Sequence, residues 1–149
     1  MEKYGAKPEH FAEIARINHA HSVNNPYSQF RDMYSLDQIL ASTSQHKYLT
    51  KLQCCPTSDG AAAVVLCSQK FLDNHSHLNV QAVEIAGQAL ATDDVALLGE
   101  SAIELVGAEM TRLAAKIAFR DAGIGPKDVQ VVECHDCFSA NEMYVFLRI

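Results

Sequence analysis

The sequence lacks the features of membrane proteins and of nucleic-acid-binding proteins. Its longest near-continuous apolar run, Gly60–Cys67, is far shorter than the about twenty residues that a membrane-spanning helix needs. It has no excess of basic residues, because 12 Lys and Arg stand against 18 Asp and Glu and give a net charge of −6. We therefore expect no membrane span and no nucleic-acid partner.

The cysteines do not form a regular disulfide framework. There are five, of which Cys54 and Cys55 are adjacent and Cys134 and Cys137 form a C-x-x-C pair. An odd number with this spacing indicates thiols in a reducing compartment. A zinc site and a redox pair are the alternatives, but adjacent cysteines rarely ligate one tetrahedral metal. The sequence also has no G-x-G-x-x-G and no phosphate-loop motif, and we expect neither a metal nor a bound cofactor.

The composition and the apolar spacing predict an ordinary globular domain with several helices. Apolar residues make up 48% of the chain and charged residues 20%, as in single soluble domains. Pro8 and the apolar spacing after it predict a helix over 8–20. The capping box Ser35–Gln38 predicts a short helix to about Ala41. A short helix over 68–74 and a long amphipathic helix over 101–122, capped by Gly123, complete the set.

Three apolar stretches predict strands. They are Gly60–Ser68, Val80–Ala91 and Val129–Val132, and Gly87 weakens the second. A strand, a long helix and another strand in succession imply an α/β fold with parallel pairing.

The candidate chemistry follows the last strand, where ligands gather in open α/β sheets. His135, Asp136 and Cys137 offer a base, an orienting carboxylate and a nucleophile; a plain polar cap at the strand end is the alternative. The turn 55–60 is either a ligand loop or a simple turn. We interpret His19 and His21, on or beside the first helix, as surface or loop-anchoring residues.

Two stretches, Cys54–Ala63 and His135–Phe138, resemble the thiolase superfamily, and so does the loop His21–Phe30. The His-Asp-Cys-Phe motif is similar to that of the peroxisomal, sterol-carrier-type 3-oxoacyl-CoA thiolases, since most thiolases have Asn-Glu-x-Phe there. The resemblance runs from Met1 to about Glu142.

This resemblance implies an α/β, thiolase-like fold with αβαβα layers, of which the chain would be the incomplete central part. Residues 1–52 would be a remnant of the thiolase loop region, and residues 53–98 would be the closing strands of the N-terminal half. Residues 99–149 would begin the C-terminal half. Such a piece is expected to expose strand edges and apolar faces, and to be marginally stable or prone to aggregation.

The resemblance also implies an activity, the thiolytic cleavage of 3-oxoacyl-CoA by CoA in peroxisomal β-oxidation. CoA would be a substrate, no further cofactor is implied, and the full-length protein would be a homodimer. His135 would be catalytic, as an oxyanion-hole donor. Cys55 and Ser58 would contact CoA, and Asp136 and Cys137 would support the site.

Three thiolase motifs are absent from the chain. It lacks the nucleophilic Cys-x-Ser in its family setting, the Gly-His-Pro motif and the C-terminal Cys-x-Gly. We therefore expect the isolated chain to be inactive. The alternative is a non-catalytic truncated product that binds acyl-CoA or full-length subunits. A peroxisomal location is implied, with cytoplasm or mitochondrion as alternatives, because the chain ends in Leu-Arg-Ile rather than a Ser-Lys-Leu-type signal.

Overall fold

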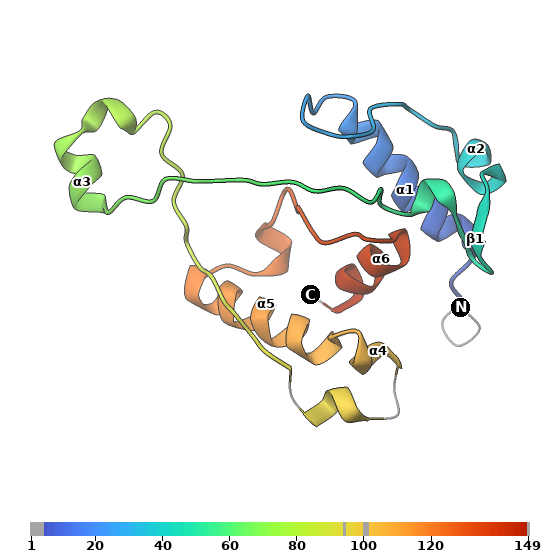
Figure 1. Cartoon of the computed structure of the whole chain (residues 1–149). Helices are drawn as coiled ribbons and strands as arrows, with labels where there is room; N and C mark the ends of the chain where they lie inside the picture. Colours follow the sequence, from blue (N-terminus) through green and yellow to red (C-terminus); the bar gives the residue numbers. More distant parts are fainter. Residues whose placement is uncertain (1–4, 94, 100–101, 149) are drawn as a thin grey trace.

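The computed structural model describes residues 5–93, 95–99 and 102–148 (Figure 1). The α-helices in these ranges are α1 (Pro8–Ser22), α2 (Leu36–Ala41), α3 (Gln69–Asn74), α4 (Ala102–Leu105), α5 (Ala108–Ala122) and α6 (Ser139–Arg148). The 3-10 helices are η1 (Lys51–Gln53), η2 (Ser76–Leu78), η3 (Val95–Leu98) and η4 (Pro126–Asp128). Two short strands, β1 (Ser44–His46) and β2 (Leu49–Thr50), form an antiparallel hairpin. No helix in the described ranges is both long and apolar enough to cross a membrane.

The predicted helices of the first half are confirmed. α1 starts with Pro8 in its first turn and ends at Ser22, slightly beyond the predicted boundary. α2 begins with the predicted capping box: the Gln38 backbone N–H donates to Ser35 Oγ at 3.2 Å, and the Ser35 backbone N–H donates to Gln38 Oε1 at 2.8 Å. These two bonds satisfy backbone donors that the helix itself leaves free.

The compact part of the molecule is a small cluster where α1 and α2 meet. Ile39 and Ala12 are fully buried, and Ala15 is nearly so. The two alanines let α2 approach α1 closely enough for Ile39 to fill the space between them. Partly buried apolar side chains surround this cluster: Tyr34, Leu36, Leu40 and Leu52. Because Leu52 lies in η1, the cluster also fixes the start of the segment that continues into Cys54.

The long helix predicted over 101–122 is two helices. α4 ends at Leu105 and α5 starts at Ala108, with Gly107 between them at φ 87°, a conformation that interrupts the α-helical backbone. Ser101 lies outside the described residues. The predicted C-terminal cap is confirmed: Gly123 and Ile124 donate to the carbonyls of Arg120 and Phe119 at the end of α5.

The prediction that 60–68, 80–91 and 129–132 form paired strands is wrong for this structure. None of the three takes part in a strand ladder among the described residues, and Figure 1 shows the first two as long runs of chain that lead to and from α3. A run of apolar residues indicates a segment that tends to be buried, but a strand also needs a hydrogen-bonded neighbour. Here the apolar side chains stay exposed, as expected for an incomplete fold: Val64, Val65, Leu66, Val83, Ile85, Leu90, Val131 and Val132.

Candidate functional site

The two motifs that carry the thiolase resemblance lie side by side. Cys54 and Phe138 form an isolated antiparallel β-bridge, and the Cys55 backbone N–H donates to the Cys137 carbonyl at 3.0 Å. α6 also packs against both α1 and α5. The fold therefore joins two segments that are distant in the sequence into one surface.

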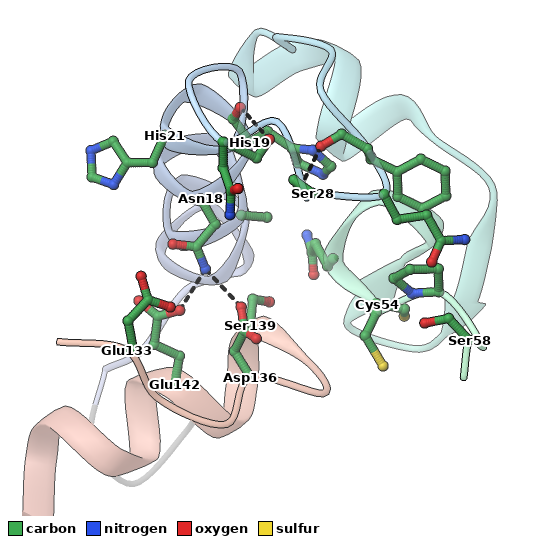
Figure 2. A pocket seen from close by; sticks show the side chains of 18 of the residues that line it. Asn18, His19, His21, Ser28, Cys54, Ser58, Glu133, Asp136, Ser139 and Glu142 are labelled. Carbon is green, nitrogen blue, oxygen red and sulfur yellow. Dashed lines mark hydrogen bonds between the residues drawn. The ribbon is translucent and has the colours of Figure 1, made fainter. Parts of the chain in front are cut away.

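A mixed polar and apolar pocket of about 780 Å³ lies over this junction. Its walls come from α1, the loop 25–30, the segment 52–60 and the segment 132–142 (Figure 2). Cys55 and Ser58, the two predicted CoA contacts, both line it. In the part of the chain that the structure describes, no group of three or more His, Cys, Asp or Glu is placed to hold a metal ion.

The predicted catalytic residue His135 borders the pocket without lining it. Its neighbours Cys134 and Asp136 line the pocket, whereas His135 is exposed. Its backbone carbonyl accepts a hydrogen bond from the Asn141 side-chain amide. Asp136 bonds to α1 rather than to His135 within the described residues. The predicted arrangement of His135 as base, Asp136 as orienting carboxylate and Cys137 as nucleophile is therefore not formed in this structure.

Asn18 of α1 connects the His135 segment to the rest of the site. Its single side-chain amide donates to Asp136 Oδ2 at 2.9 Å and to Glu142 Oε2 at 2.6 Å (Figure 2). Both acceptors are carboxylates, which makes these bonds stronger than neutral ones. The neighbouring His19 bonds through its ring to the Leu52 carbonyl at 3.0 Å, which confirms it as an anchor. Asn18 carries no spacing or motif that would have marked it in the sequence.

Two buried polar side chains line the pocket without a hydrogen-bond partner. Gln53 and Ser139 are each 4% exposed, and neither Gln53 Oε1 nor Ser139 Oγ has a partner among the described residues. Both residues line the pocket. No pattern in the sequence signals them, because burial and unmet hydrogen bonding depend on how distant segments pack.

Two partly buried thiols of the site, Cys54 and Cys134, have raised pKa values. Burial, with a smaller contribution from Cys55, raises the pKa of the Cys54 thiol. Burial also raises the pKa of Cys134, and the carboxylates of Glu142 and Asp136 raise it further. Since the thiolate is the reactive form of cysteine, neither side chain is prepared to act as a nucleophile.

We expect a defined order of alkylation by iodoacetamide at pH 8. Cys54 and Cys134 should react several-fold more slowly than the exposed Cys55 and Cys67, because a raised pKa and burial both reduce accessible thiolate. Mass spectrometry of timed samples gives the rate at each site, and the same reaction in urea should bring the rates together. Labelling of Cys134 before Cys67 would contradict this electrostatic description.

Comparison with known proteins shows which proteins the chain is similar to. Residues 89–147 match the family model described as "Thiolase C-terminal domain-like". This match and the relatives below confirm the resemblance to the thiolase superfamily and the incomplete α/β, thiolase-like fold. The match extends beyond Glu142, where the resemblance was expected to end.

The relatives are sterol carrier proteins and thiolases. The chain is 52% identical over 147 residues to "Sterol carrier protein 2" of Gallus gallus, which covers 98% of this chain and 27% of that protein. It is 47% identical to "Non-specific lipid-transfer protein-like 2" of Caenorhabditis elegans, over 100% of this chain and 36% of that protein. It is 36% identical to "Acetyl-CoA acetyltransferase" of Methanothermobacter thermautotrophicus, over 95% of this chain and 36% of that protein. The chain thus spans about a quarter to a third of the length of these relatives.

Proposed function

We propose that this chain is part of an acyltransferase of the thiolase family, which cleaves 3-oxoacyl-CoA with CoA. The observation that carries the proposal is the bridge between Cys54 and Phe138, because it brings the predicted CoA-binding segment against the His-Asp-Cys-Phe segment over one pocket. The names of the thiolase relatives support the same chemistry. CoA is the substrate, and no other cofactor is part of the proposal.

Each predicted site residue then has a defined task. The Cys55 backbone N–H is already bonded to the Cys137 carbonyl, so the Cys55 thiol and the Ser58 hydroxyl are the groups left to contact CoA. His135 donates a ring N–H to the thioester oxygen as negative charge develops there. Removing one such donor typically costs about 3–4 kcal/mol of transition-state stabilisation. The nucleophile would come from a Cys-x-Ser in its family setting, which this sequence lacks, because its one Cys-x-Ser, Cys137–Ser139, belongs to the His-Asp-Cys-Phe segment.

CoA binding to the chain is the direct test. Isothermal titration with CoA should show one site, and Cys55→Phe should lower the affinity by at least about tenfold, because the ring would occupy the pocket that Cys55 lines. Cys67→Phe is the matched control, since Cys67 is also an exposed free cysteine and does not line that pocket. Equal affinities for the two variants would contradict the proposal.

A second candidate function is lipid binding without catalysis. It is favoured by the relatives named for sterol carriage and lipid transfer, and by the missing nucleophile. Binding of palmitoyl-CoA and of palmitate distinguishes the two functions. A CoA site binds palmitoyl-CoA, and free CoA displaces it. A lipid site binds both palmitoyl-CoA and palmitate, and free CoA displaces neither. A peroxisomal location and a homodimeric full-length protein belong to the first proposal.

A further inference from the structure

Two cysteines that are distant in the sequence lie next to each other in the structure. The Cys55 backbone N–H donates to the Cys137 carbonyl at 3.0 Å. A single backbone hydrogen bond of that length keeps the Cα atoms of its two residues within about 6.5 Å of each other. Disulfides span Cα–Cα distances of about 4.4–6.8 Å. The fold therefore holds Cys55 and Cys137 within the range that one disulfide bridges.

The other three cysteines are poorly placed to compete for such a bond. The Cys54 thiol donates to the Thr50 carbonyl at 3.4 Å, and burial raises the pKa of the Cys54 and Cys134 thiols. Cys67 precedes α3, which Figure 1 shows well away from α1 and α6. Thiol–disulfide exchange needs an accessible thiolate, so the bond falls to the two cysteines that remain.

Those two cysteines are free thiols, and one of them is open to small reagents. Cys55 is exposed, and Cys137 is half-buried. A small oxidant therefore reaches the Cys55 sulfur first, and Cys137 lies within range to resolve the adduct that forms there. This division of tasks, an accessible thiol beside a resolving one, is typical of cysteines that respond to redox conditions.

We propose that Cys55 and Cys137 form a reversible disulfide when a low-molecular-weight disulfide such as oxidised glutathione accumulates. The Cys55 thiolate attacks one glutathione sulfur and releases one glutathione thiolate. The Cys137 thiolate then attacks the Cys55 sulfur and releases the second. The two protein thiols are oxidised to one disulfide, glutathione disulfide is reduced to two glutathiones, and the protons of the protein thiols pass to the released thiolates.

The disulfide changes both the pocket and the stability of the chain. Cys55 lines the pocket and Cys137 does not, so the bond turns the Cys55 side chain away from the pocket. It also closes a loop of more than half of the chain, which restricts the unfolded state and stabilises the folded one. The effect on CoA binding rests on the proposed function, whereas the formation of the disulfide does not.

Disulfide mapping of the folded 149-residue chain is the test. The chain is equilibrated in glutathione buffers of increasing oxidation and blocked with N-ethylmaleimide, and its monomer fraction is digested with trypsin. Peptides 52–70 and 128–148 should then be joined, with fragment ions that assign the bond to Cys55 and Cys137. Dithiothreitol should separate them. Oxidation should also raise the urea midpoint and weaken CoA binding by at least about tenfold.

Serine variants identify the cysteines that form the bond. Cys55→Ser and Cys137→Ser should each abolish the joined peptides. Cys54→Ser and Cys134→Ser are the matched controls, one at the neighbour of Cys55 and one at the other cysteine of the C-x-x-C pair, and should keep the joined peptides. Oxidation in urea should spread the bonds over several cysteine pairs, because the fold no longer selects one.

Three results would overturn the proposal. They are joined peptides that persist in Cys55→Ser or Cys137→Ser, glutathione adducts without joined peptides in the most oxidising buffer, and the same distribution of bonds with and without urea. The proposed function is judged separately, by CoA binding to the reduced chain. Joined peptides in a chain that binds no CoA support the disulfide and contradict the proposed function. CoA binding without joined peptides refutes the disulfide alone.

Discussion

Replacing Ile39 with alanine is expected to unfold the cluster of α1 and α2. Ile39 is the one large side chain that is fully buried among the described residues, and the cluster around it is small. Truncating a buried Ile to Ala costs about 2–5 kcal/mol through lost burial and the cavity left behind. The free energy of unfolding of a typical domain is only about 5–15 kcal/mol. This chain also carries many exposed apolar side chains.

Urea and thermal unfolding followed by circular dichroism measure the effect. The matched control is Ile17→Ala, the same substitution on α1 at a side chain that is 39% exposed, for which we expect less than about 1 kcal/mol. Because Leu52 packs on the cluster and precedes the bridge, Ile39→Ala should also weaken CoA binding. Equal unfolding midpoints for the two variants would show that the cluster is not the stabilising core.

Replacing Gly87 with alanine is expected to detach the segment around it from α5. A Cβ atom at Gly87 would lie 2.4 Å from the Ala118 carbonyl oxygen and 2.9 Å from the Ala122 backbone nitrogen. Both are backbone atoms of a regular helix and cannot move aside cheaply. The segment has to shift instead, at a cost of about 1–3 kcal/mol.

Hydrogen–deuterium exchange and limited proteolysis measure that detachment. Amides in 82–91 and along α5 should exchange faster in Gly87→Ala, and cleavage in this segment should speed up. Gly60→Ala is the control, because a Cβ there meets nothing within 4 Å and the backbone is not in the left-handed region. Exchange in Gly87→Ala that matches this control would mean that the close approach does not hold in solution.

The helices were predictable because their signals are local. Pro8, the capping box at Ser35 and Gln38, and the cap at Gly123 act within one turn of chain, and all three are present in the structure. Strand pairing is not local: 60–68 has the composition of a buried strand, but composition does not specify a neighbour. In the sequence, Gly87 only weakens a strand prediction. In the structure, its lack of a side chain allows the segment around it to approach α5 closely.

Of the candidate site, only the motifs could be predicted from the sequence. Cys55 and Ser58 both line the pocket, because they lie three residues apart in one short segment, and their contact with CoA stays a prediction. The neighbouring roles of Asn18, Gln53 and Ser139 arise from contacts between distant segments, so no spacing in the sequence signals them. The role of His135 stays a prediction that the binding and activity measurements will decide.

The hydrogen bonds from Asn18 to Asp136 and Glu142 span 118 and 124 residues of chain. Closing a loop of that length costs on the order of 4 kcal/mol of chain entropy. During synthesis, α1 can dock on α2 as soon as α2 leaves the ribosome, but the pocket has to wait for α6. A nascent chain therefore carries this helical pair before it can form the pocket, which needs Ser139 and Glu142 of α6.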